Sequence, residues 1–298
     1  MKTIKKCGAF IFAFLILFFG VSAPRVYAAE IKLDKKELAY FESVKNKNAS
    51  TYPRVALYLA GKELSESAYL INDTTYVPFR AVGNIIGAKI EYDSKNRVAT
   101  ATMNGLTVSA ADNSYIVTAN ERPLLSKTPA VILSDGRMYA PIRSIAKALS
   151  LAVEWVPGRT VKLSGTPTPL THASAYYRSD DLYWLSKIIS AESRGEPLLG
   201  QIAVGNVVLN RMRHRDYPNT IYGVIFDKKY GVQFSPVIDG SIYSSPTYTA
   251  TVAAKICLEG ISLSPDTLFF LHPEKSTSSW IPANRKYAFT VENHWFFY

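Results

Sequence analysis

Residues 76–82 read YVPFRAV, and residues 139–145, 63 positions further along the chain, read YAPIRSI. The correspondence continues without gaps as far as Val98, which aligns with Val161. In each copy a proline precedes apolar residues at helical spacing, and alternating residues around a turn then predict a hairpin. A gap-free match of this length indicates a duplicated structural module.

Each copy also has a strand-like run upstream of its helix, at residues 55–59 and 115–119. Each half therefore reads β-β-α-β-β, and the module covers residues 50–165. The repeated Tyr-x-Pro-x-Arg signature resembles that of the copper amine oxidase N-terminal-like domain, a stalk module of exported Gram-positive proteins. The resemblance implies a spacer or a wall-binding module, and a purely structural role stays open because a fold does not fix a function.

The first 28 residues have the three parts of a secretory signal peptide. Three lysines form a basic start, residues 9–21 are apolar, and the small residues ending at Ala28 form a cleavage site. The apolar run is shorter than the roughly 20 residues of a membrane span, and the alternative is a retained anchor. No later segment is apolar enough to span a bilayer. We therefore expect an exported protein that begins at Ala29 after cleavage.

The chain has a formal net charge of +10, of which Lys2, Lys5, Lys6 and Arg25 leave with the signal peptide, so about +6 remains. An export signal argues against nucleic acid as a partner. An anionic wall polymer suits a spread-out positive field, although the same charge fits a merely soluble basic protein.

Cysteine and histidine usage limits the chemistry of the chain. Cys7 lies in the signal peptide, so Cys257 is alone in the exported chain and no intramolecular disulfide can form. Residues 29–171 contain neither His nor Cys, the ligands that copper sites prefer, so the copper of the family name is not expected here. We expect no metal and no cofactor.

Residues 164–179 combine Pro, Gly, Ser and Thr with no hydrophobic period, which is typical of a linker. We therefore predict a multidomain α+β protein. Its parts are a signal peptide at 1–28, a duplicated stalk domain at 29–165, a linker at 166–179 and a second domain at 180–298.

The second domain opens with a predicted helix over residues 182–192, with apolar residues at 182, 185, 188 and 189 forming one stripe. Glu192 follows Ile188 by four residues and Ile189 by three, so its carboxyl continues the stripe at the buried edge of the helix. Desolvation there should raise its pKa, as a general acid near neutral pH requires. The alternative is a structural ion pair with Arg194 or Arg211.

The string AESRGEP at 191–197, followed by GQIAV at 200–204 and VVLNR at 207–211, resembles the SleB/CwlJ cell-wall hydrolase family of spore-cortex-lytic enzymes. The likeness continues in order through the rest of 180–298. It implies a lysozyme-like, mainly helical domain that acts as a lytic transglycosylase on peptidoglycan, in the wall or the spore cortex. The family's catalytic glutamate maps onto Glu192, and a single carboxyl suits a reaction that consumes no water. A hydrolase would need a second carboxylate roughly 5 to 9.5 Å away.

Several other residues are candidate glycan contacts by type. Gln233 can pair with acetamido or hydroxyl groups, and Phe234 and Trp280 offer flat faces to sugar rings. His272 replaces an asparagine that relatives often have at this place and is a further candidate, and Glu196 is given a supporting role. We expect Tyr243 and Tyr287, which could also serve by type, to be core residues.

Two other classes of protein compete with this interpretation. Cys257 with His272 and His294 could form the nucleophile and base of a peptidoglycan peptidase or amidase. However, Cys257 lies near the end of a helix predicted over 245–260, whereas reactive thiolates favour helix N-termini, so we interpret it as a small buried hydrophobe. The histidines show no zinc-ligand spacing. A noncatalytic wall-binding protein is the other alternative.

Overall fold

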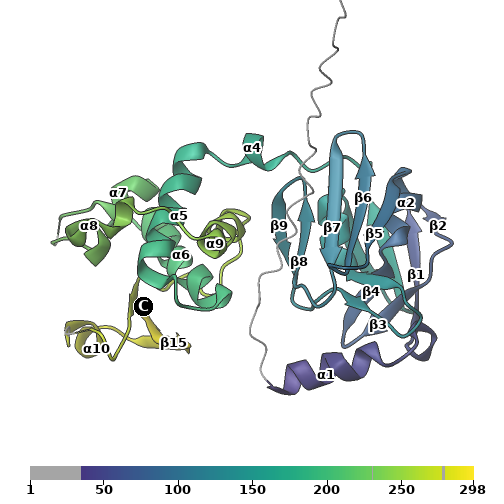
Figure 1. Ribbon diagram of the computed structural model, residues 1–298, viewed down its shortest axis with the longest axis horizontal. Helices are drawn as coiled ribbons and strands as arrows, with labels where there is room; N and C mark the ends of the chain where they lie inside the picture. The colour runs from purple at the N-terminus through teal and green to yellow at the C-terminus, as the bar shows by residue number, and fades with distance from the viewer. Residues whose placement is uncertain (1–34, 230, 277–278) are drawn as a thin grey trace, which may run out of the picture.

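The structure is a computed structural model that describes residues 35–229, 231–276 and 279–298. The predicted signal peptide at 1–28 lies outside the described residues. Figure 1 shows a β-rich domain beside a mainly helical domain, joined by a segment that contains the short helix α4 (Ala173–Tyr176). In the described part of the chain, no helix has the length and apolarity to cross a membrane.

The β-rich domain has a larger sheet with the strand order β10-β11-β4-β3-β1-β13-β12 and a smaller sheet with the order β5-β6-β7-β8-β9. A shared apolar core joins the two sheets to helices α2 (Arg80–Ile86) and α3 (Ile142–Ala148). Helix α1 (Lys35–Lys45) and the turn η1 (Ala49–Thr51) pack through a second cluster. The strands are β1 (Arg54–Leu59), β2 (Lys62–Glu63), β3 (Ala68–Ile71), β4 (Thr74–Pro78), β5 (Lys89–Asp93), β6 (Val98–Met103), β7 (Leu106–Ala111), β8 (Ile116–Ala119), β9 (Arg122–Leu125), β10 (Val131–Ile132), β11 (Met138–Pro141), β12 (Ala152–Val156) and β13 (Thr160–Ser164).

The two repeated signatures lie next to each other in the larger sheet. Strands β4 and β11 pair antiparallel, with Tyr76 opposite Pro141 and Tyr139 opposite Pro78. Both tyrosines are buried. Each copy then continues with a helix and two strands, but β5-β6 joins the smaller sheet whereas β12-β13 joins the larger. The two copies therefore interleave and do not fold as separate halves.

The segment predicted as a linker is packed against the β-rich domain. The backbone N–H of Ala173 donates to the carbonyl of Asn120 at 2.9 Å, and the Asn120 side chain donates to the carbonyl of Leu170 at 2.6 Å. Ala173 and Tyr177 are buried. The segment that joins the two domains is therefore held against the β-rich domain by hydrogen bonds of its backbone.

A buried ion pair joins the two domains at the end of helix α9 (Tyr248–Leu258). The Glu259 side chain is only 1% exposed and accepts hydrogen bonds from Arg122 at 2.6 and 2.9 Å and from Tyr177 at 2.7 Å. Lys147 lies 3.1 Å from the same carboxylate. Burial opposes the charge of Glu259, but these hydrogen bonds outweigh it and hold the pKa of the carboxyl below its ordinary value.

The C-terminal domain is built on α9 and two long helices, α5 (Ser179–Ser193) and α6 (Leu198–Arg213), which share an apolar core. A Cβ added at Gly205 of α6 would lie 2.7 Å from Ile189 of α5 and 2.8 Å from the sulfur of Cys257 in α9. A glycine is thus required for the three helices to approach this closely. Around them lie α7 (Ile221–Ile225), α8 (Ser235–Asp239), the turn η2 (Ser241–Tyr243) and α10 (Trp280–Asn284).

The C-terminal domain also contains a small sheet that we do not predict from the sequence. Its strands, in the order β14-β16-β15, are β14 (Phe269–Leu271), β15 (Tyr287–Val291) and β16 (His294–Phe297). Phe296 of β16 is fully buried and packs on Ala203, Val204 and Val207 of α6. The sheet therefore stands next to the helical core and forms one wall of the cavity described below.

Candidate active site

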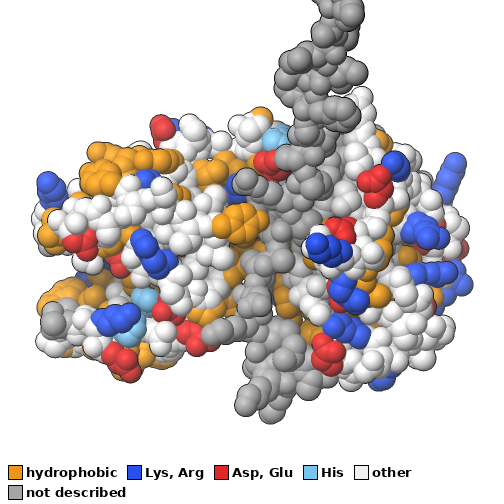
Figure 2. Space-filling view, in the orientation of Figure 1, with side chains coloured by type: hydrophobic (Ala, Val, Ile, Leu, Met, Phe, Trp, Pro, Cys, Tyr) orange, Lys and Arg blue, Asp and Glu red, His pale blue; other side chains and the backbone are white. Residues whose placement is uncertain are grey.

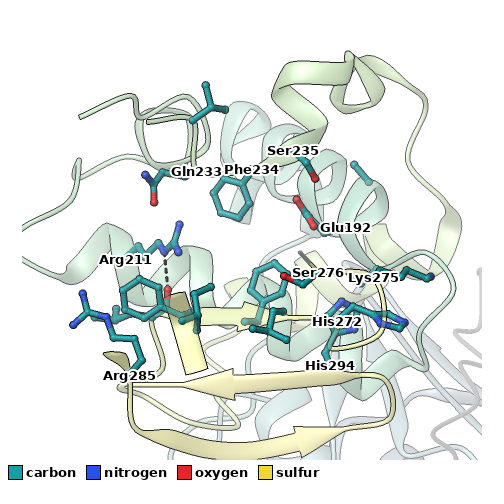
Figure 3. A pocket seen from close by; sticks show the side chains of 18 of the residues that line it. Glu192, Arg211, Gln233, Phe234, Ser235, His272, Lys275, Ser276, Arg285 and His294 are labelled. Atoms are coloured by element: carbon teal, nitrogen blue, oxygen red, sulfur yellow. Dashed lines mark hydrogen bonds between the residues drawn. The ribbon is translucent and has the colours of Figure 1, made fainter. Parts of the chain in front are cut away.

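Glu192 lies in the last turn of α5, at the end of the predicted apolar stripe. Leu185, Ile188 and Ile189 are fully buried, as the spacing predicted, and Glu192 is partly buried. Its side chain borders a cavity of about 1400 Å³. Figure 3 shows the carboxyl pointing into this cavity, between α8 on one side and the small sheet on the other. Glu192 is therefore one of the residues that line this cavity.

The carboxyl of Glu192 has no hydrogen bond and no ion pair with any of the described residues. The pKa of Glu192 is raised to about 7, mainly by burial and also by the negative charge of Asp239, while the positive charge of Arg211 acts in the opposite direction. An uncharged, unpartnered carboxyl facing a cavity can donate its proton to a bound group at neutral pH. Glu192 therefore has the properties of a general acid.

Neither arginine that could have paired with Glu192 does so. Arg194 is exposed, and its Nε donates to the carbonyl of Ser190 at 3.2 Å. The Nε of Arg211 donates to the carbonyl of Leu268 at 2.7 Å, and its guanidinium lies over the rings of Tyr217 and Phe234. The structural ion pair considered from the sequence is therefore wrong, and Arg211 acts on Glu192 only through space.

The other carboxylates that border the cavity are Glu196 and Asp216. Glu196 accepts hydrogen bonds from the backbone and side chain of Asn293 at 3.4 and 3.1 Å and lies 3.6 Å from His294. Its side chain is only 7% exposed. Asp216 is 59% exposed and lies 3.7 Å from His214. Glu196 is thus held by its neighbours and Asp216 lies in solvent.

His272 and His294 line the same end of the cavity as Glu196, with ring centroids 5.6 Å apart. Burial lowers the pKa of His294, and the nearby charge of Glu196 partly opposes this effect. The Nδ1 atoms of both rings are buried without a hydrogen-bond partner among the described residues. Within that part of the chain, no group of three His, Cys, Asp or Glu side chains is arranged to hold a metal ion.

The predicted glycan contacts all border the cavity that contains Glu192, although their roles stay predictions. Trp280 is 52% exposed and offers a free surface, whereas Phe234 is buried against Phe270 and Arg211. Gln233 is partly buried, and its amide donates to the carbonyl of Gly231.

Two tyrosines are not where we expected them. Tyr243 and Tyr287 are 63% and 52% exposed, so the expectation that both are core residues is wrong. Each carries a hydroxyl that gains little from burial, and each lies in a short peripheral element, η2 or β15, with no second layer over it.

Four cations border the cavity that were not predicted as site residues from the sequence, namely Arg194, Arg211, Lys275 and Arg285. Arg285 lies over Phe269 and Trp280, with its guanidinium 4.5 and 5.0 Å from the ring centroids. The sequence offers a signal for Arg211 as a site residue, because this charged side chain stands in a helix whose other residues are mostly apolar and buried. Lys275 and Arg285 lie in irregular or short segments, and no pattern singles them out.

Cys257 does not border the cavity. It is 1% exposed, and its sulfur lies 3.4 Å from the carbonyl of Ile202, inside the helical core. Burial raises the pKa of its thiol. This placement separates Cys257 from His272 and His294, which border the cavity, so the proposed nucleophile and base of a peptidase are not brought together.

Comparison with protein families assigns both domains. The model of the cell wall hydrolase family matches residues 195–297, and that of the copper amine oxidase N-terminal domain matches residues 58–163. The first match begins just after Glu192, so it does not itself include the candidate acid.

Spore cortex-lytic enzymes are among the curated proteins to which the chain is similar. The protein of Bacillus cereus is 39% identical over 105 residues, which are 35% of this chain and 39% of the relative. The protein of Halalkalibacterium halodurans is 36% identical over 111 residues, 37% of this chain and 33% of the relative. The matched stretch thus spans less than two-fifths of either relative.

Among solved structures, the catalytic domain of the germination-specific lytic transglycosylase SleB from Bacillus anthracis is similar to the same part of the chain. The two are 36% identical, and the alignment covers 41% of this chain and 97% of that domain, with a TM-score of 0.38.

Proposed function

Because residues 195–297 belong to the cell wall hydrolase family and residues 58–163 to the copper amine oxidase N-terminal domain family, we propose that this chain cleaves the glycan strands of peptidoglycan with Glu192 as its acid/base. The observation that carries the proposal is the state of the Glu192 carboxyl. It borders the cavity without a partner among the described residues, and its pKa is raised to about 7.

In the first step, protonated Glu192 donates its proton to the glycosidic oxygen as the bond from that oxygen to C1 of muramic acid breaks. The developing positive charge at C1 lies close to a carboxylate that has just become negative, which stabilises it. The raised pKa matters here because a carboxyl with an ordinary pKa would already have lost its proton at neutral pH.

In the second step, ionised Glu192 accepts the proton of the muramic acid 6-hydroxyl while that oxygen bonds to C1. The product is a 1,6-anhydro sugar, Glu192 is protonated again, and no water is consumed. Hydrolysis would need a second carboxylate to activate water or form a covalent intermediate. Glu196 is bonded to Asn293 and close to His294, and Asp216 lies in solvent, which favours the lyase.

We propose the spore cortex or the cell wall as the place of action, reached by export through the segment 1–28. The relatives are spore cortex-lytic enzymes, which favours cortex peptidoglycan during germination. The same cleavage of glycan strands would also serve sporulation or turnover of the cell wall. Gln233, Phe234, Trp280, His272 and Glu196 would contact the glycan along the cavity.

For the β-rich domain we propose a duplicated stalk module that holds the catalytic domain at the wall, by binding wall polymer or a partner protein. Its packing on the catalytic domain through Arg122 and Glu259 supports a fixed spacer over a loosely tethered one.

Mass spectrometry of the released muropeptides tests the proposed reaction. Parent protein and the Glu192→Gln variant are incubated with purified cortex and with purified vegetative wall. Asp180→Asn, an exposed carboxylate in the first turn of the same helix, is the matched control. We expect anhydro-muramic ends from the parent and the control and none from Glu192→Gln.

Reducing ends in place of anhydro ends would make the enzyme a hydrolase. Full activity of Glu192→Gln would remove Glu192 from the mechanism. If iodoacetamide or Cys257→Ser abolished cleavage, the thiol mechanism would replace the present one. The cortex and wall digests run side by side identify the substrate.

A further inference from the structure

A cluster of exposed aromatic side chains lies on the C-terminal domain outside the cavity of Glu192. Tyr183, Tyr222 and Tyr243 are 50%, 53% and 63% exposed, and none of them borders that cavity. They surround Trp184, whose ring centroid is 5.0, 5.2 and 6.5 Å from theirs. Figure 2 shows hydrophobic side chains gathered over α7, where Tyr222 lies. These four residues are called the aromatic platform below.

The platform is a fixed surface assembled from three elements. Trp184 meets all three tyrosines edge to face. The Tyr222 ring also packs at 35° to Phe226, with the centroids 4.5 Å apart, and the ring is still 53% exposed and can meet a ligand. From below, the buried amine of Lys187 donates to the Tyr243 carbonyl at 2.8 Å and lies 4.9 Å from the centroid of the Tyr183 ring. One buried lysine thus ties the helix α5 to the turn η2.

The chain connects the cavity to the platform through α8 and η2. Ser235, the first residue of α8, borders the cavity, and Ile238 near the end of α8 is 73% exposed. The turn η2 follows directly and ends at Tyr243. On α5, Trp184 precedes Glu192 by eight residues, which is roughly 12 Å along the helix axis. A polymer longer than the cavity can therefore reach the platform around α8.

We propose that the aromatic platform is a second binding surface for glycan, which holds sugar units of the wall polymer outside the cavity. This proposal rests on the proposed function, since it takes the same polymer as ligand. Sugar rings present C–H faces that pack on aromatic rings, and their hydroxyl and acetamido groups can pair with tyrosine hydroxyls.

The charges around the platform disfavour an anionic lipid surface as its occupant. Asp180 and Asp239 are exposed at its borders, whereas Lys187 is buried beneath it. Exposed carboxylates repel anionic lipid headgroups, which attract basic segments instead. The rings with hydroxyl groups and the link to the cavity therefore select glycan as the occupant.

A binding measurement tests the platform with full-length protein. The probe is insoluble purified peptidoglycan, and every protein carries Glu192→Gln so that the probe stays intact. Tyr222→Ala should weaken sedimentation with the probe about five-fold, the size expected for one lost aromatic contact, and Tyr183→Ala with Tyr222→Ala more than either alone. Tyr248→Ala removes a tyrosine at the start of α9 that is 47% exposed and belongs neither to the platform nor to the lining of the cavity, and it is the matched control.

A second measurement separates binding from a general structural effect. With active Glu192, the Tyr222→Ala variant should lose cleavage of intact wall relative to cleavage of a soluble tetrasaccharide of the same glycan, so the ratio of the two kcat/KM values falls. Equal binding by all variants, equal loss in Tyr248→Ala, or an unchanged ratio would overturn the proposal.

Analytical ultracentrifugation tests the rival occupant. A dimer of the parent that becomes a monomer in Tyr222→Ala would make the platform an interface between copies of the chain and would overturn the proposal. Failure of Glu192→Gln to abolish cleavage would overturn the acid/base assignment instead, and the sedimentation result would still stand.

Discussion

Burial is accompanied by opposite pKa shifts at two glutamates of the C-terminal domain. Glu259 accepts hydrogen bonds from Arg122 and Tyr177 and lies against Lys147, and its pKa is lowered. Glu192 has no such partner among the described residues, and its pKa is raised to about 7. The first carboxyl is kept charged to join two domains, and the second is kept protonated beside a cavity.

The difference teaches that burial alone does not decide what a carboxyl does. Desolvation is the largest influence on both pKa values, and it favours the neutral acid in both places. Hydrogen bonds from cationic side chains of the other domain lower the pKa of Glu259 in spite of its burial. Arg211 acts on Glu192 only through its charge, and the pKa of Glu192 stays raised. Whether a buried carboxyl has cationic hydrogen-bond partners therefore distinguishes the structural carboxylate Glu259 from the proposed catalytic acid Glu192.

The largest expected effect is the loss of catalysis when the acid is removed. Glu192→Gln should lower kcat roughly 10³-fold, which corresponds to about 4 kcal/mol of transition-state stabilisation. The measurement is the rate of anhydro-muropeptide release from purified wall. Asp180→Asn should keep the parent rate, and a Glu192→Gln enzyme within ten-fold of the parent would be incompatible with the account.

The next effect is the loss of stability when Glu259 is left without its arginine. Arg122→Met should cost about 3 kcal/mol at pH 7, because it leaves a buried charge with incomplete pairing. Glu259 stabilises the fold above its unfolded pKa, and this contribution is lost as pH falls through the lower folded pKa, so the cost should shrink in acid. Urea unfolding followed by tryptophan fluorescence measures it.

The control for that experiment is Arg178→Met, which removes an arginine that is 82% exposed and lies 3.5 Å from Asp181. An exposed pair contributes less than about 1 kcal/mol. Equal losses in the two variants would show that the contact between Arg122 and Glu259 does not join the domains.

A smaller effect of opposite sign is expected for stability at Glu192. Its folded pKa of about 7 lies above the ordinary value of 4.5, so the parent loses stability as pH rises between these values. Glu192→Gln has no charge to bury. The shift corresponds to about 3 kcal/mol, which partial solvent exposure of Glu192 reduces, so the stability of the variant relative to the parent should improve by about 2 kcal/mol from pH 4 to pH 8. Thermal unfolding at both pH values measures this, and a difference independent of pH would contradict it.

The smallest effect concerns the fine adjustment of the acid. Asp239 raises the pKa of Glu192 from the surface, and asparagine at this position can keep the hydrogen bond from the Ser241 backbone. Asp239→Asn should therefore move the alkaline limb of the pH–rate profile down by a fraction of a pH unit, and high salt should abolish the difference. An upward shift would contradict the assigned sign.

The features of the fold that follow from local periodicity could be predicted from the sequence. The stripe at Leu185, Ile188 and Ile189 places Glu192 at a buried edge without any knowledge of tertiary contacts. The repeat likewise predicts a helix and a hairpin after each Tyr-x-Pro-x-Arg signature. These patterns are local, because residues three or four apart share a face of a helix and residues two apart share a face of a strand.

Features that depend on contacts between distant segments could not be predicted. The pairing of β4 with β11 and the exchange of hairpins between sheets depend on which strands meet. Arg122 and Glu259 are 137 residues apart in the chain, and neither stands in a recognisable pattern. The packing of residues 166–179 on the β-rich domain also depends on contacts with distant residues such as Asn120. The composition of the segment predicts a linker but contains no sign of these contacts.

The most direct test of the account is a pH titration of the Glu192 carboxyl itself. Infrared difference spectra of the full-length protein would follow its protonated band, with Glu192→Gln used to assign that band. The account predicts that the band persists through weak acid and disappears around pH 7. Disappearance near the ordinary value of 4.5 would contradict the claim that an unpartnered, partly buried Glu192 holds its proton for catalysis.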